Sequence, residues 1–123
     1  MLCRFGHNAE VKSEASGDKA LVILSGEIKT PPIARDARRD IGFLIRKLQQ
    51  GVKLQMPQSR PMPTIGSRCH ELRVGDRGQT WRVIYRTDPG AILVVALFSK
   101  KTEKTPKKVV QQVKRLLAEY DAN

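Results

Sequence analysis

Arginine and lysine side chains recur through residues 71–109 in a pattern suited to phosphate chemistry. Arginine presents a planar fork of donors that matches a phosphate bidentately, and lysine adds a point charge. Such groups can hold an RNA backbone and stabilise the extra negative charge of a pentacoordinate phosphoryl transition state. Because RNA carries its own 2′-OH nucleophile, this cleavage needs no metal ion, no cofactor and no protein nucleophile. The candidate catalytic residues are Glu71, Arg73, Arg82, Lys100 and Lys101, and the candidate RNA-binding residues are Arg86, Lys104, Lys107 and Lys108.

Two expected strands, residues 69–74 and 79–86, carry most of these groups. Side chains alternate between the two faces of a strand, so apolar and charged residues separate here. One face holds Leu72, Val74, Trp81, Val83 and Tyr85, and the other holds Glu71, Arg73, Arg82 and Arg86. If helices cover the apolar set, the charged face stays open to a ligand. Lys100 and Lys101 would then lie at its lip.

Two amphipathic helices are expected to supply that cover. Thr30 and Pro31 suit the start of the first helix, and Gly51 suits its end. Between them, one apolar stripe consists of Ala34, Ala37, Ile41, Leu44 and Leu48. The second helix is expected to begin at Thr105-Pro106. Its stripe consists of Val109, Val113, Leu116 and Tyr120.

The remaining pattern predicts an α+β fold. Residues 19–24 read as a first strand, and 91–98 as a central strand because it is apolar on both faces. Residues 52–68 hold several prolines and are expected to form a loop. We predict an antiparallel or mixed sheet of about four strands with helices packed on one face. A single domain would span 19–123, after a loosely ordered N-terminal extension over 1–18.

Composition limits the functional classes. The chain has 123 residues and a formal net charge of +11. Between Arg60 and Arg115 there are 13 basic and 4 acidic residues, so this stretch carries most of the excess. A basic balance of this size favours nucleic acid or an acidic protein as partner. Cys3 and Cys69 show no metal-ligand spacing and are interpreted as reduced thiols. No apolar run is long enough for a membrane span, and we expect a cytoplasmic protein.

Several of these residues also have a structural interpretation. Glu71 suits either a general base or an ion pair with Arg73 or Arg82. Trp81 suits either the core or a base-stacking platform. The lysines between 100 and 108 suit a solvated surface. Those in the first turn of the second helix, however, oppose the helix dipole. A local rule broken repeatedly in one place points toward function.

Two segments at their proper separation carry a resemblance to a known family. They are CHELRVGDRGQTWRVIYR at 69–86 and FSKKTEKTPKK at 98–108. The chain resembles RelE/HigB-like toxins of bacterial type II toxin–antitoxin modules, in the phage-derived HigB-like subgroup, over about 20–118. The resemblance implies a RelE-like microbial ribonuclease fold and mRNA cleavage, often on the translating ribosome. It also implies neutralisation by a cognate antitoxin, commonly a helix-turn-helix protein.

Carried over by position, the resemblance implies roles for individual residues. Arg82 matches the family's arginine that contacts the scissile phosphate, and Arg73 matches a basic position on the preceding strand. Lys100 and Lys101 match the basic pair after the last strand. RelE itself has a tyrosine beyond that pair, and residues 102–109 hold none.

Two other readings remain open. A ParE-like toxin would share the fold but inhibit gyrase and cut no RNA. A basic module that binds RNA or ribosomes without catalysis would show the same charge pattern.

Overall fold

The computed structural model describes residues 10–12, 18–24, 34–100 and 105–123. The elements in chain order are β1 (Glu10–Lys12), β2 (Ala20–Ile23), α1 (Arg35–Gln49), β3 (Ser59–Pro61), β4 (Cys69–Asp76), β5 (Gln79–Thr87), β6 (Ala91–Lys100) and α2 (Lys107–Ala122). The predicted α+β class is confirmed. Neither described helix is long and apolar enough to cross a membrane.

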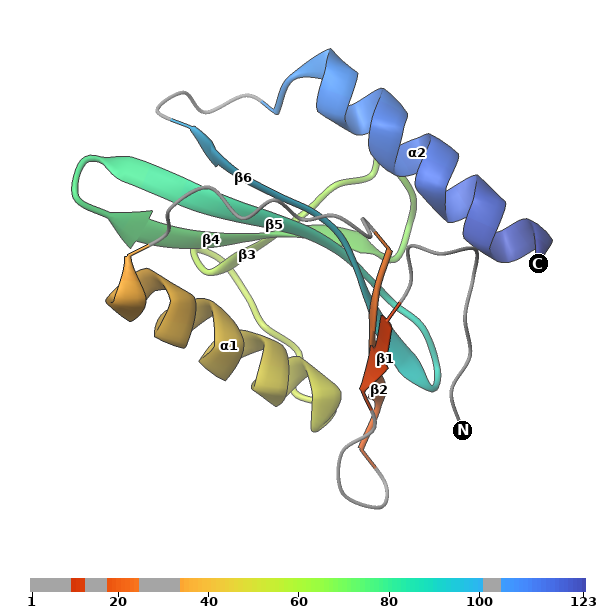
Figure 1. Cartoon of the computed structure of the whole chain (residues 1–123), viewed down its shortest axis with the longest axis horizontal. Helices are drawn as coiled ribbons and strands as arrows, with labels where there is room; N and C mark the ends of the chain where they lie inside the picture. The colour runs from red at the N-terminus through yellow and green to blue at the C-terminus, as the bar shows by residue number, and fades with distance from the viewer. Residues whose placement is uncertain (1–9, 13–17, 25–33, 101–104) are drawn as a thin grey trace.

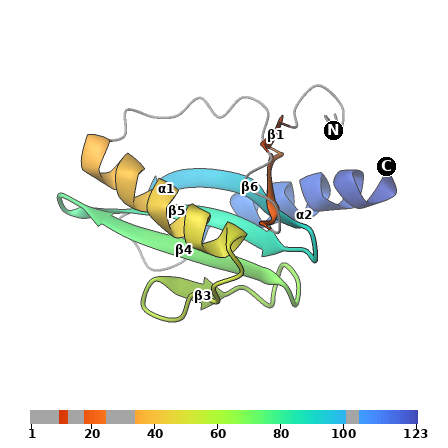
Figure 2. The same cartoon turned by 90° about the horizontal axis from the view of Figure 1, so that it is seen from below.

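One mixed sheet joins all the described strands in the order β1-β2-β6-β5-β4-β3. Strand β2 runs parallel to β6, and the other neighbours are antiparallel. The apolar strand β6 lies inside the sheet, as predicted. Two edge strands were not expected: β1 falls within the expected extension and β3 within the expected loop. Each has three residues, too few to show an alternating pattern; Figure 2 shows β3 at the edge beside β4.

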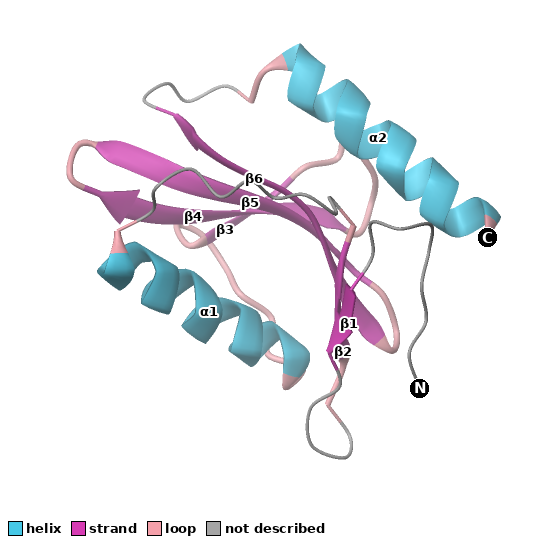
Figure 3. Ribbon diagram, in the orientation of Figure 1, coloured by secondary structure: helices cyan, strands magenta, loops and turns pink. Residues whose placement is uncertain are grey.

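The two helices lie on opposite faces of the sheet (Figures 1 and 3). Helix α1 buries its apolar stripe against the face that holds Leu72, Trp81 and Tyr85. Helix α2 buries its own stripe against the other face, where Ile84 and Leu93 belong to the same cluster. The expectation that both helices pack on one face is therefore corrected. Apolar side chains on both faces of β5 and β6 have to be covered, so each face receives a helix.

The helix ends differ in part from the expected ones. Ala34 precedes α1 without a side-chain cap, and the expected start at Thr30 lies outside the described residues. Gly51 follows α1 with φ +89°, so the predicted glycine stop is confirmed. Helix α2 begins at Lys107 after Pro106. The hydroxyl of Thr105 does not cap α2, because it donates a hydrogen bond to Glu71 instead.

A tight hairpin turn joins β4 to β5. Arg77 and Gly78 both have positive φ, at 44° and 83°, as a two-residue type I′ turn requires. The turn brings Asp76 close to Trp81, whose indole N–H donates to the carboxylate at 3.1 Å. Trp81 is 2% exposed and belongs to the core under α1. Cys69 is a buried free thiol, and burial raises its pKa.

Candidate functional site

The charged side chains of β4 and β5 emerge on one face of the sheet. Arg73 lies directly opposite Arg82 in the antiparallel register, and Glu71 and Arg86 follow on the same face by alternation. The predicted phase of these four residues is confirmed. Leu72, Val74, Trp81, Val83 and Tyr85 lie on the opposite face under α1, also as predicted.

That charged face is not open, and the expectation is corrected. Glu71 is 0% exposed, Arg82 is 1% exposed and Arg86 is 7% exposed. Ile84 lies between the two arginines along β5 and joins the apolar cluster that α2 covers. Alternation predicted which face these groups share, but it did not predict that the last helix would cover this face.

Glu71 is the centre of a buried polar network. Arg82 donates from Nη1 to Oε1 of Glu71 at 2.9 Å, and Thr105 donates from Oγ1 to Oε2 at 2.7 Å. Nε of Arg73 lies 4.0 Å from Oε1. Both carboxylate oxygens of Glu71 therefore accept a hydrogen bond although the side chain is buried. The geometry supports the ion-pair interpretation of Glu71.

Arg86 is committed to two carboxylates. It donates from Nε and Nη2 to Asp88 at 2.9 and 3.0 Å, and from Nη1 and Nη2 to Asp121 at 2.9 and 2.7 Å. A guanidinium has five N–H groups, so these four bonds leave one. Hydrogen bonding to Arg86 lowers the pKa of Asp121, and the same bond raises the pKa of Arg86. Arg86 thus fastens the end of α2 to β5, a role that competes with the RNA-binding role expected for it.

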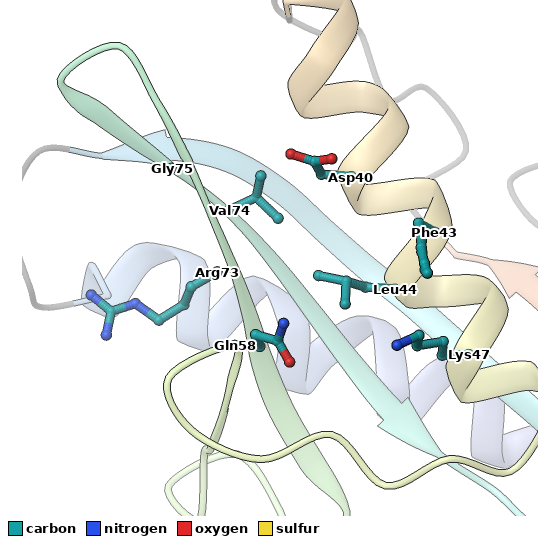
Figure 4. A pocket seen from close by; sticks show the side chains of 8 residues that line it. All are labelled: Asp40, Phe43, Leu44, Lys47, Gln58, Arg73, Val74 and Gly75. Carbon is teal, nitrogen blue, oxygen red and sulfur yellow. The ribbon is translucent and has the colours of Figure 1, made fainter.

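Arg73 is the most accessible of the three face-sharing arginines. Its side chain is 22% exposed. Figure 4 shows it extending from β4 away from α1. Arg73 is also among the residues that line a pocket of about 430 Å³ between α1 and the end of β4. Arg73 can therefore meet a ligand while it remains near Glu71.

Two of the candidate RNA-binding lysines lie in the first turn of α2. Lys107 and Lys108 are exposed in the first turn of α2, and that described turn holds no acidic residue. The bond between Thr105 and Glu71 places this turn beside the buried network. Lys100 ends β6 opposite Thr80 in the register. Lys101 and Lys104 lie outside the described residues.

Three partner residues were missed in the sequence. Asp88 follows Arg86 by two positions, which was a usable local signal. Thr105, just before α2, and Asp121, within α2, meet the sheet only after folding, so no local pattern predicts them. Among the described residues, no group of three or more His, Cys, Asp or Glu side chains could hold a metal ion.

These observations define a small basic α+β domain with two exposed lysines at the start of α2 and a partly buried arginine beside Glu71. Residues 32–118 match the family described as phage-derived protein Gp49-like, and the chain belongs to that family. The family is associated with RelE-like toxins, and the sheet with its two helices is consistent with a RelE-like fold. Searches of curated proteins and of solved structures gave no match.

Proposed function

We propose that this chain is the toxin of a type II toxin–antitoxin module and an endoribonuclease that cleaves mRNA on the ribosome. The membership in the Gp49-like family supports the toxin class. The net charge of +11 and the exposed lysines of α2 support a phosphate-rich substrate. The proposed partners are mRNA, the ribosome and a cognate helix-turn-helix antitoxin, in the cytoplasm, as for a HigB-like protein.

The proposal assigns RNA contact to the more accessible residues and positioning to the buried ones. Arg73 contacts the scissile phosphate and stabilises its developing charge. The lysines around the start of α2 attract and align the strand: Lys100, Lys101, Lys104, Lys107 and Lys108. Glu71 and Arg82 are positioning residues, because they are buried and act through Arg73. This assignment departs from the resemblance, in which Arg82 itself would contact the phosphate.

A single observation carries the proposal. Arg73 is partly exposed, yet its Nε lies 4.0 Å from the carboxylate that Arg82 also binds. A guanidinium oriented by a buried carboxylate loses little freedom when it binds a phosphate. Binding of an acidic protein partner would not require a guanidinium with so fixed an orientation.

The burial of the network favours a second candidate function. With Glu71 and Arg82 enclosed, neither is placed to move a proton on a bound RNA. A basic module that binds RNA or ribosomes without cleavage would use the same surface. The two candidates differ in whether mRNA stays intact.

Induced expression tests the proposal in cells. Wild type and Arg39→Gln, an exposed charge control on α1, should halt growth and amino-acid incorporation with fragmented mRNA. Arg73→Gln should restore growth at equal soluble level. Arrest with intact mRNA would favour the binding module, and arrest with altered plasmid supercoiling would favour a gyrase inhibitor. Normal growth on full expression of soluble wild type would contradict the proposal.

A further inference from the structure

A second pocket lies on the opposite face of the sheet from the charged network. Its volume is about 430 Å³, within the range of small-ligand sites. It is bounded by the end of α1, the loop that follows, and the strands β4 and β5. The lining residues used below are Lys19, Val52, Lys53, Leu54, His70 and Tyr85. None of them belongs to the site proposed above.

The inner wall of this pocket is an ordered aromatic pair. His70 stacks on Tyr85 with ring centroids 5.4 Å apart and an interplanar angle of 18°. Nδ1 of His70 lies 3.3 Å from the carbonyl oxygen of Arg68, and the hydroxyl of Tyr85 bonds to buried Ser59 at 2.6 Å. Tyr85 is 2% exposed, so a flat ligand would pack against His70, whose ring is already held and loses little side-chain freedom.

The backbone is irregular at this point. The register between β5 and β6 shifts between Ile84 and Tyr85. Such a bulge redirects the side chain beside it, and bulges are common next to binding sites. Ile84 pairs with Ala96 and Tyr85 with Val94, so the extra residue is Val95 of β6, on the strand beside Tyr85.

The mouth combines apolar surface with positive charge. Val52 lines the pocket and is 45% exposed, so a large apolar side chain faces solvent here. Lys19 and Lys53 line the pocket, and no carboxylate does so among the described residues. Nζ of Lys19 is held by the carbonyl oxygen of Asp88 at 3.0 Å.

The helix end does not cancel this charge. Carbonyl groups in the last turn of α1 carry partial negative charge toward this side. Those of Lys47, Leu48 and Gln49 already accept backbone hydrogen bonds, the last from the N–H of Lys19. The two lysines therefore set the sign of the site.

We infer that this pocket binds one nucleoside 5′-monophosphate unit, with the base against His70 and Leu54 and the phosphate at Lys19 and Lys53. A flat ring, an apolar edge and one anionic group are what the lining accommodates. The unit has two sources: a free mononucleotide or one nucleotide of an RNA strand. Binding here is independent of cleavage, so this inference does not rest on the proposed function.

An NMR titration of the full chain tests the inference at low salt. The probes are AMP, GMP, CMP and UMP in one arm and a tetranucleotide RNA in the other. At least one mononucleotide should shift the amide signals of Leu54, His70 and Thr87. The matching nucleoside and inorganic phosphate alone should bind more weakly. An RNA that binds the pocket more tightly than any mononucleotide identifies the strand as the source, and the reverse identifies the free nucleotide.

Variants separate this pocket from the rest of the surface. Lys53→Ala, an exposed change, should weaken mononucleotide binding by about tenfold, whereas Lys114→Ala on α2 should leave it unchanged. Val52→Glu, which puts a carboxylate at the mouth, should weaken it further. Shifts absent at millimolar mononucleotide, or equal loss in Lys53→Ala and Lys114→Ala, would overturn the inference. So would shifts confined to Arg73 and the start of α2.

Discussion

Glu71 accepts a hydrogen bond from Arg82 at 2.9 Å across two neighbouring strands, and both side chains are almost fully buried. Thr105 bonds to the second oxygen of the same carboxylate. The ion pair joins β4 to β5, and the hydrogen bond from Thr105 adds the residues just before α2. This buried group lies beside the partly exposed Arg73. The pair explains why charged residues can occupy this face although a helix covers it.

Breaking this pair should unfold the protein more readily, because the remaining charge would be buried without its partner. We expect Glu71→Ala and Arg82→Ala each to lower the free energy of unfolding by about 3–5 kcal/mol. The double variant Glu71→Leu/Arg82→Met should lose less than the sum, since no charge is then left alone. Urea denaturation measures all of these. An unchanged free energy of unfolding in Arg82→Ala would show that the pair does not stabilise the fold.

Arg73→Gln should separate activity from stability. Its side chain is partly exposed, so the free energy of unfolding should fall by less than about 1 kcal/mol. Loss of a donor to the transition state should lower RNA cleavage by about 100-fold. Arg39→Gln removes the same charge on α1 and should change neither quantity. A fall in stability as large as that of Arg82→Ala would assign Arg73 to the structure alone.

The stability that the ion pair between Arg86 and Asp121 contributes should depend on pH in a defined direction. Hydrogen bonding to Arg86 lowers the pKa of Asp121 in the folded chain. Its contribution to stability is therefore present above the unfolded pKa of about 3.9, and it is lost as pH falls through the folded value. Asp121→Asn should be less stable than wild type near neutral pH, and the gap should close in acid. A gap that widens on acidification would contradict this assignment.

The lysines at the start of α2 should set the salt dependence of RNA binding. Each phosphate contact with single-stranded RNA contributes about 0.7 to the slope of log affinity against log salt. We expect Lys107→Gln/Lys108→Gln to reduce that slope by about 1.4 and to weaken all sequences equally. The control Arg38→Gln/Arg39→Gln, with the same change in net charge, should reduce it less. Equal slopes in the two double variants would show that only net charge matters.

The sequence predicted the parts of the fold that follow from periodic patterns. Apolar alternation in β4 and β5 was sufficient to assign Trp81 and Tyr85 to one face and Arg73 and Arg82 to the other. Gly51 predicted the end of α1 because a positive φ there favours glycine. These signals are local: each can be identified within one short segment of the chain.

The sequence could not show which face each helix would cover. Ile84 gave a hint, since one apolar side chain between Arg82 and Arg86 requires an apolar partner on the charged face. Thr105, a second partner of Glu71, lies just before α2, and Asp121, one of the two partners of Arg86, lies within it; each is more than 30 residues away along the chain. Such contacts depend on where the helices pack. Alternation alone therefore predicted an open charged face.

The most direct test of the central claim is to map the 5′ ends of an mRNA translated in a reconstituted reaction that contains the purified protein. We predict new internal ends with wild type and Arg39→Gln, and their loss with folded Arg73→Gln. An mRNA that stays intact while wild type blocks translation would contradict the claim, as would the same ends with Arg73→Gln.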